Sequence, residues 1–323
     1  MNYFLGIDVG SSKTHAIIAD ETGRCTGFGK ASGGNYQSVG YDGLTNELID
    51  SYRQAIQMSK IEASQIAGAG FGVSGYDFPS DRENHLKAIS SLGLSCPVDV
   101  VNDGVQGLLA GTTHGFGVNV TAGSSVNCCG RGRDGREGRI VGNGMAFGEY
   151  GGAAEIVWRG LHMVNYAWIK RIHPTALTQV YLEAVGAKNE LDLMEGLSND
   201  TYHLTHYLVI KVIEIAQSGD SAAGEVIRWA GEELGWLATA VARQIGMEND
   251  DVEIIQSGSI FNAGEVINTP MLEVVLRNCP KARLLRLNGP PVVGAVLLGM
   301  QQAGFTGYAV RSCLADTAKI LVI

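Results

Sequence analysis

The sequence predicts an α/β protein of two similar halves that face a shared cleft. Two stretches of the chain read almost alike, Phe4–Thr14 (FLGIDVGSSKT) and Gly117–Val126 (GVNVTAGSSV). Each is an apolar strand that ends in small, hydroxyl-rich residues, and strand and helix patterns alternate after each one. Since glycine lets backbone N–H groups approach an anion and serine adds a hydroxyl donor, both strand ends are typical of phosphate-binding loops.

The first half begins with three strands whose connecting turns are too short for crossover helices, which predicts an antiparallel meander. Helices and strands then alternate. The strands are expected at Tyr3–Val9, Thr14–Ala19, Cys25–Ala31, Ile66–Val73 and Val98–Val101, and the helices at Asp42–Met58, Arg82–Leu92 and Val105–Ala110.

A glycine-rich passage at His114–Gly117 is the best domain boundary, which places the two domains at residues 1–115 and 116–323. The second half repeats the plan of the first. Its strands are expected at Val118–Thr121, Val126–Gly130, Gly138–Val141 and Val252–Gln256, and its helices at Ala153–Ile172, Leu204–Ala216, Asp220–Ile245 and Pro290–Met300. The pattern of Tyr308–Ile323 does not decide between helix and strand, and the tail after about residue 304 could pack back on the first domain.

Composition narrows the class of protein. The 323 residues are 45% hydrophobic and 18% charged, and the net charge of −9 disfavours broad nucleic-acid binding. The sequence has no apolar run of the roughly 18 residues that a membrane span needs and no leader pattern, so a cytoplasmic location and no membrane partner are expected. The six cysteines form no C-x-x-C spacing, and adjacent Cys128 and Cys129 are expected to be buried free thiols.

The first motif, Asp8-x-Gly10-x-Ser12-x-Thr14, lies between two strands. A Walker loop and a dinucleotide fingerprint both need a helix after the loop, so this motif is neither. Asp8 at a strand end can hold metal-bound water, and residues 10–14 can wrap phosphates. The alternative interpretation is an ordinary hairpin with a polar tip.

A second motif, Asn102-Asp103-Gly104, ends one strand and precedes a helix, where an α/β sheet presents side chains to its cleft. Asp103 could accept a proton from a hydroxyl group as a general base, or it could simply cap the helix. Thr121–Ser125 is predicted to face the first loop, and Ser257–Ser259 to lie against an adenosine.

In this order the motifs resemble those of the superfamily that contains actin, the heat-shock ATPases and the sugar kinases. More narrowly, the chain is similar to the N-acetylglucosamine kinase branch of the BadF/BadG/BcrA/BcrD-type ATPase family. The matching segments are Asp8–Thr14, Gly33–Asn35, Gly72–Gly75, Asn102-Asp103, Thr121–Ser125, Gly142–Gly152, Gly258–Ile260 and Gly289–Val296. The resemblance implies two actin-like (ribonuclease H-like) domains flanking a central nucleotide cleft, and a homodimer.

The resemblance also implies the activity, which is ATP- and Mg²⁺-dependent phosphorylation of a sugar hydroxyl, on N-acetylglucosamine or a related hexose or amino sugar. Asp103 would be the catalytic base, and Asp8 would hold Mg²⁺ through water. The implied nucleotide-binding residues are Gly10, Ser11, Ser12, Lys13, Thr14, Gly123, Ser124, Gly219, Gly258 and Ser259. The implied substrate-binding residues are Asn35, Ser74, Gly75, Asn102, Asp103, Ser125, Asn143, Gly144 and Glu149.

Three departures from the family pattern bear on the substrate. The second loop, Ala122–Ser125, lacks the usual threonine, and Asn143 stands where a tryptophan is usual. Glu149 replaces a shorter aspartate and could bind a sugar hydroxyl or only close its loop. A different hexose, an amino sugar or an anhydro sugar therefore stays open.

Two other functions fit the same fold. One is an ATPase activator of a reductase or dehydratase, which needs cysteines that bridge an iron–sulfur cluster between subunits, and no cysteine pair here has that placement. The other is a weakly catalytic sugar sensor. A repressor would need a helix-turn-helix, for which the chain leaves no room before its first strand.

Overall fold

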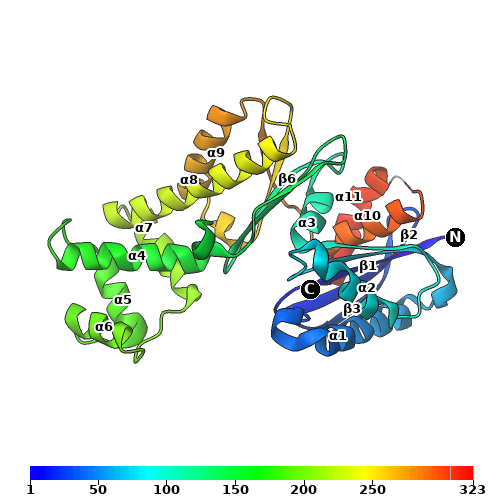
Figure 1. Cartoon of the computed structure of the whole chain (residues 1–323), viewed down its shortest axis with the longest axis horizontal. Helices are drawn as coiled ribbons and strands as arrows, with labels where there is room; N and C mark the ends of the chain where they lie inside the picture. The colour runs from blue at the N-terminus through cyan, green and yellow to red at the C-terminus, as the bar shows by residue number, and fades with distance from the viewer. Residues whose placement is uncertain (306, 323) are drawn as a thin grey trace.

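The computed structural model describes residues 1–305 and 307–322, and it contains two five-stranded mixed sheets with helices packed on them. Figure 1 shows two lobes side by side: the N-terminal and C-terminal segments form the lobe on the right, and the middle of the chain forms the lobe on the left. The predicted α/β fold with two similar halves is confirmed.

The first sheet has the strand order β3-β2-β1-β4-β5. Strands β1, β2 and β3 pair antiparallel, as predicted, and β4 and β5 continue the sheet parallel to β1. The strands are β1 (Tyr3–Val9), β2 (Lys13–Asp20), β3 (Cys25–Ser32), β4 (Ile66–Val73) and β5 (Val98–Asn102).

The second sheet repeats this topology in the order β8-β7-β6-β9-β10, with an antiparallel meander followed by two parallel strands. Its strands are β6 (Gly117–Ala122), β7 (Val126–Arg131), β8 (Glu137–Arg139), β9 (Glu253–Ser257) and β10 (Arg283–Arg286). Strand β6 therefore occupies the place of β1, and the loops that follow these two strands are equivalent.

Helices cover both faces of the first sheet. Alternate residues of β1 point to opposite faces, so Leu5 packs with Leu44 of α1 while Phe4 packs with Val296 of α10. At Gly6 the helix α10 lies so close that a Cβ would stand 2.4 Å from the Val296 nitrogen. The helices of this lobe are α1 (Tyr36–Ser59), α2 (Arg82–Ser90), α3 (Asp103–Gly111), α10 (Val292–Gln302) and α11 (Arg311–Leu321).

The second lobe contains the largest apolar core, in which α4, α7 and α8 pack with the second sheet. In Figure 1, α5 and α6 lie at the end of this lobe that is farthest from the first one. Its helices are α4 (Ala153–Trp168), α5 (Leu177–Val185), α6 (Glu190–Ser198), α7 (Val209–Gln217), α8 (Ser221–Gln244) and α9 (Glu265–Asn278).

Several boundaries differ from the prediction. Helix α1 opens with a short turn that Asn35 caps by accepting the N–H of Gln37, and the backbone then breaks at Gly40 (φ 70°, ψ 173°). The helix continues after this kink, next to its predicted start at Asp42. Helix α7 begins five residues late, and β8 is shorter than expected. Helices α5, α6 and α9 and strand β10 have no predicted counterpart, and the undecided tail is helical as α11, with Ile323 outside the described residues.

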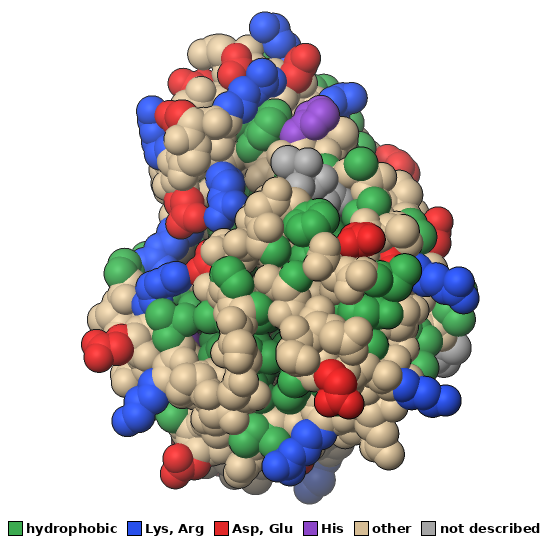
Figure 2. Space-filling model, turned by 90° about the vertical axis from the view of Figure 1, so that its right-hand side faces the viewer, with side chains coloured by type: hydrophobic (Ala, Val, Ile, Leu, Met, Phe, Trp, Pro, Cys, Tyr) green, Lys and Arg blue, Asp and Glu red, His purple; other side chains and the backbone are tan. Residues whose placement is uncertain are grey.

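The described helices include none that is both long and apolar enough to cross a lipid bilayer. Figure 2 shows the outer face of the first lobe, where acidic, basic and hydrophobic side chains are interspersed. An indentation at the left of this view is bordered by side chains of both charges. This face therefore carries no continuous basic surface.

Candidate functional site

The parallel strands of the first sheet bring three predicted segments to one edge. Strand β1 ends at Val9, β4 at Val73 and β5 at Asn102, and the N–H of Ser74 donates to Val9 O across 2.8 Å. Because the carboxyl ends of parallel strands meet at one edge of a sheet, the residues that follow them line the same crevice. The first loop therefore lies beside Ser74 and Asp103.

The first loop is a tight turn in which the N–H of Gly10 donates to Lys13 O at 2.9 Å. Three residues at its tip are exposed: Ser11, Ser12 and Lys13. Thr14, by contrast, is fully buried, and its hydroxyl donates to Ser32 O across 2.8 Å. The tip can thus offer backbone N–H groups and an ammonium to an anion, while the Thr14 hydroxyl joins two strands.

Three polar side chains connect this loop to the one after β4. Asn35 Nδ2 lies 3.3 Å from Ser11 Oγ and 3.2 Å from Ser74 Oγ, and the two hydroxyl oxygens are 3.3 Å apart. Gly75 has a φ of 86°, and a Cβ there would stand 2.6 Å from Asn35 Oδ1. The structure therefore gathers Ser11, Asn35, Ser74 and Gly75 at one point of the crevice.

Asp103 begins α3 but does not cap it. The cap is Asn102, whose Oδ1 accepts the N–H of Gly104 at 2.9 Å. Burial raises the pKa of Asp103 to about 6, against the effect of the Gly104 N–H. Burial and then the nearby Asp103 carboxylate raise the pKa of Asp8 to about 7. Two carboxylates with raised pKa values thus lie near one another at the crevice.

Gln106, one turn into α3, was not predicted as a site residue. Its side chain is fully buried and lies over Gly72, close enough to Asp8 to lower the pKa of that carboxyl. No described residue gives either atom of the Gln106 amide a hydrogen bond of ordinary geometry. A Cβ on Gly72 would stand 1.6 Å from Gln106 Oε1, so this glycine makes room for the amide. A buried amide without partners is costly, which points to a group or water that joins it and Asp8.

The second loop follows β6 as the first follows β1. The N–H of Gly123 donates to Ser125 O at 3.0 Å, and Ser124 and Ser125 are exposed. The start of α4 sits on this loop, because the N–H groups of Ala153 and Ala154 donate to the carbonyls of Gly123 and Ser124 at 2.8 and 3.1 Å.

A cavity of about 550 Å³ adjoins the second loop. It is lined by Gly123 and Ser124, by Ser259 after β9, and by apolar side chains that include Tyr207, Ile210 and Ile260. Tyr207 and Ile210 are largely exposed, with 70% and 56% of their surface open to solvent. Apolar walls beside a loop with serine hydroxyls suit a ligand with an aromatic base and a polar tail.

The turn after β9 depends on Gly258, which has a φ of 96° and would place a Cβ 2.2 Å from Ala122 O. Arg286 holds the same turn by donating to the carbonyl oxygens of Gln256 and Gly258 at 2.6 and 2.7 Å. Gly219 has a φ of 97° just before α8, and it does not line the cavity.

Glu149 braces the glycine-rich loop before α4. Its Oε1 accepts the N–H of Val141 at 2.6 Å, and its Oε2 accepts the N–H groups of Gly142 and Asn143 at 2.9 and 2.8 Å. Of the two alternatives for this residue, the structure shows the one in which it closes its loop. Asn143 and Gly144 lie on the stretch that this carboxylate holds.

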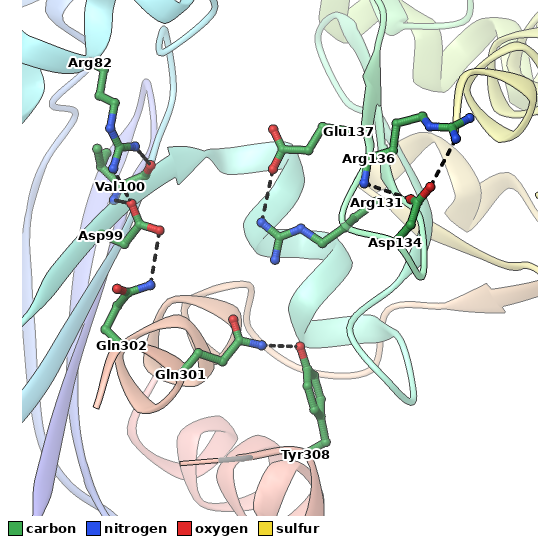
Figure 3. A network of polar contacts seen from close by, with 10 residues as sticks. All are labelled: Arg82, Asp99, Val100, Arg131, Asp134, Arg136, Glu137, Gln301, Gln302 and Tyr308. Atoms are coloured by element: carbon green, nitrogen blue, oxygen red, sulfur yellow. Dashed lines mark hydrogen bonds and ion pairs between the residues drawn. The ribbon is translucent and has the colours of Figure 1, made fainter. Parts of the chain in front are cut away.

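A second cavity, of about 330 Å³, lies between the lobes beside α3. Figure 3 shows two ion pairs that flank the space between the lobes. Arg131 and Glu137 of the second lobe are 3.1 Å apart, and Arg82 and Asp99 of the first are 2.7 Å apart. Asn102 also lines this cavity, so it adjoins the crevice that contains Asp103.

The pairing of these loops matches a known family. A sequence model described as the BadF/BadG/BcrA/BcrD ATPase family matches residues 5–299. The chain belongs to this family. As a BadF-family protein, it contains both loops and both crevice carboxylates within the matched residues.

Curated relatives of this BadF-family chain align over nearly its full length. It is 26% identical to the N-acetyl-D-glucosamine kinase of Dictyostelium discoideum over 310 residues, covering 92% of this chain and 97% of that protein. It is 23% identical to the N-acetylmuramic acid/N-acetylglucosamine kinase of Clostridium acetobutylicum over 306 residues, covering 94% and 99%.

Solved structures agree in fold. A Chromobacterium violaceum protein proposed to be an N-acetylglucosamine kinase superimposes with a TM-score of 0.70 at 22% identity, covering 92% of this chain and 99% of that one. A ROK family glucokinase of Streptomyces griseus superimposes with a TM-score of 0.54 at 17% identity, covering 99% and 100%. These likenesses confirm the sugar kinase-like fold of the BadF-family chain.

Proposed function

We propose that this protein transfers a phosphoryl group from ATP to a hydroxyl group of a sugar, N-acetylglucosamine or a related hexose or amino sugar. The observation that carries the proposal is the placement of Asp103. Because Asn102 caps α3, the Asp103 carboxylate stays available in the crevice beside Asp8. The assignments of the two curated relatives as kinases support the same conclusion.

The ATP phosphates would bind between the two loops, at the backbone of residues 10–13 and 123–125. The adenosine would occupy the cavity next to Ser124 and Ser259, whose volume of about 550 Å³ and apolar walls are suitable for it. Family membership supports this choice of nucleotide, since the family is described as one of ATPases.

Asp103 would act as the general base. It takes the proton of the attacking sugar hydroxyl while the sugar oxygen bonds to the γ-phosphorus and the bond from that phosphorus to ADP breaks. A pKa of about 6 leaves this carboxylate ionised at neutral pH and more basic than an exposed aspartate. Asn35 and Ser74 would bind the sugar on the side of the first loop.

The residues around Asp8 fit a magnesium ion held through water. Mg²⁺ keeps several waters and binds proteins through one or two carboxylates, and the unpartnered Gln106 amide beside Asp8 could bond to such a water. Within residues 1–305 and 307–322, no group of three or more His, Cys, Asp or Glu side chains is placed to hold a metal directly. When bound, Mg²⁺ would neutralise charge on the ATP phosphates.

The placement of the cysteines favours the kinase over an ATPase activator with an iron–sulfur cluster. Cys128 and Cys129 are both buried and free, as predicted, so this adjacent pair does not present its thiols at the surface. The chain returns to the first lobe at α10, earlier than the predicted residue 304. We further propose that, apart from these last helices, the domains divide at residues 115/116, and that the protein is a homodimer.

The test is a coupled assay of ADP release with Mg²⁺-ATP over a panel of sugars, run on the parent protein and on Asp103→Asn. Sugar-dependent turnover that falls at least 100-fold in this variant is expected. Asp134→Asn, at the exposed tip of the β7–β8 hairpin, is the matched control and should keep full activity. Sugar-independent ATP hydrolysis that survives Asp103→Asn would contradict the proposal.

A further inference from the structure

A carboxylate that no predicted role uses lies between the second loop and the glycine-rich loop. Glu155 stands in the first turn of α4, and only 5% of its surface is exposed. Its Oε2 is shielded from solvent and has no hydrogen-bond partner among the described residues. A buried, unpartnered carboxylate oxygen is one of the costlier features that a folded protein can contain.

The surroundings of Glu155 show where its partner would come from. Its Oε1 lies 3.3 Å from the position of a Cβ on Gly144, and its Oε2 lies 2.5 Å from that of a Cβ on Gly152. That same position on Gly152 is 2.7 Å from the Cα of Ser125. The two glycines thus leave room for a carboxylate in the space that separates the Gly144 loop from Ser125.

This space is connected to the proposed catalytic base. Asn127 donates to Asn102, the residue before Asp103, and its Oδ1 is 3.9 Å from the Cβ position of Gly142. The loop that starts at Gly142 near Asn127 therefore runs towards Glu155. Asn143 and Gly144 of this loop are among the substrate-binding residues that the family resemblance implies, so we expect a sugar at Asp103 to lie along it.

The helix start alone does not satisfy the Glu155 carboxylate. Burial raises its pKa, and the N–H groups of Gly152 and of Glu155 itself oppose that rise without reaching Oε2 in hydrogen-bonding geometry. The crevice already contains the carboxylates of Asp8 and Asp103. A neutral hydroxyl donor would leave this negative charge uncompensated, whereas a cation would form a charge-assisted hydrogen bond.

We propose that Glu155 is a specificity residue that binds the free ammonium group of a hexosamine, so that the protein prefers an unacetylated amino sugar. The inference rests on the proposed kinase function for its kinetic consequence but not for binding. A protonated amine would give the Glu155 carboxylate the positively charged partner that it lacks. An N-acetyl group is neutral and offers a single N–H.

The experiment compares glucosamine, N-acetylglucosamine and glucose. Calorimetry gives the dissociation constant of each sugar, and coupled ADP release gives kcat/KM. Glucosamine should bind more tightly than glucose, and Glu155→Gln should reduce that preference about tenfold, the difference between a charged and a neutral hydrogen bond. Glu265→Gln, which also removes a first-turn carboxylate but from α9, should leave the preference unchanged.

The outcomes separate the two proposals. If glucosamine does not bind more tightly than the neutral sugars, or if Glu155→Gln weakens all three equally, the assignment of Glu155 is wrong. If glucosamine binds in a Glu155-dependent way but no sugar stimulates ADP release, the kinase function is wrong and the binding site stands. Should Glu155→Gln lower the melting temperature too far, Glu155→Asp keeps the charge, shifts its position and should still favour the amine over glucose.

Discussion

Asn127 and Asn102 join the two lobes beside the crevice. The side-chain amide of Asn127, on β7 of the second sheet, donates to Asn102 Oδ1 across 3.1 Å. The same Oδ1 accepts the N–H of Gly104 at 2.9 Å. One oxygen atom therefore caps the helix that begins with Asp103 and also receives a bond from the opposite lobe.

Asn127→Ala should lower kcat/KM by about fivefold to tenfold, because one neutral hydrogen bond of about 1 kcal/mol holds the residue before the base. The loss should be mainly in kcat, since the Asn127 bond positions Asp103. Steady-state kinetics at saturating ATP measure it. Asn199→Ala, at the end of α6, is the control, and an equal loss in both variants would contradict the role of Asn127.

The Glu149 carboxylate should stabilise its loop through the hydrogen bonds that it accepts, more than through its negative charge. Glu149→Gln removes an acceptor from a group that receives three backbone N–H groups, so unfolding should become easier by about 2 kcal/mol and the KM for the sugar should rise. Denaturant titration and sugar kinetics measure the two effects. Glu137→Gln removes an exposed ion-pair partner and should cost under about 1 kcal/mol, so equal destabilisation by both would refute this account.

Much of the fold could be predicted because the central strands are clear apolar runs in the sequence. Strands β1 and β4 are buried runs followed directly by glycine or serine, and their predicted bounds match the structure. Strand β10 has only four residues, with an arginine at each end, and α9 contains Pro270. Short elements and internal prolines give weak local signals. Strand β10 forms because β9 provides a partner for it, and α9 forms because it packs against α8.

The site was predictable where a loop motif marks it and not where tertiary packing creates it. Asp8 and Asp103 follow or end strands, which is a signal in the chain itself. Gln106 is one polar residue in an apolar helix, and only the packing of α3 over Gly72 aims it at Asp8. Likewise, only the folded structure shows that Glu155 Oε2 is buried without a hydrogen-bond partner among the described residues.

Arg286 should support nucleotide binding without touching the sugar. It donates to the carbonyl oxygens of Gln256 and Gly258 and lies 3.0 Å from Asn262 Oδ1, and Asn262 lines the cavity next to the second loop. Arg286→Met should raise the KM for ATP about tenfold and leave the sugar KM unchanged, because two or three hydrogen bonds hold this turn. Arg283→Met, on the same strand but exposed, should change neither constant. If Arg286→Met raised the KM for the sugar instead of the KM for ATP, the role of Arg286 in nucleotide binding would be ruled out.

His15 should make the protein sensitive to acid. It is 5% exposed and packs edge-on against Phe28 at 5.4 Å, and burial, with smaller effects from Lys13 and Lys30, lowers its pKa from 6.5 to about 4. The unfolded chain binds a proton on this histidine at a higher pH than the folded one. The contribution of neutral, buried His15 to the free energy of unfolding is therefore fully present above pH 6.5. It is lost as the pH falls towards 4, by roughly 2–3 kcal/mol.

His15→Gln removes this proton-binding site, so its free energy of unfolding should fall less steeply than that of the parent protein between pH 6.5 and 4. Urea titrations at several pH values measure the slope. His173→Gln, at an exposed position, should keep the parent slope. Since the carboxylates are the same in all three proteins, the difference in slope isolates His15, and parallel slopes would show that His15 is protonated as readily in the folded protein as in the unfolded chain.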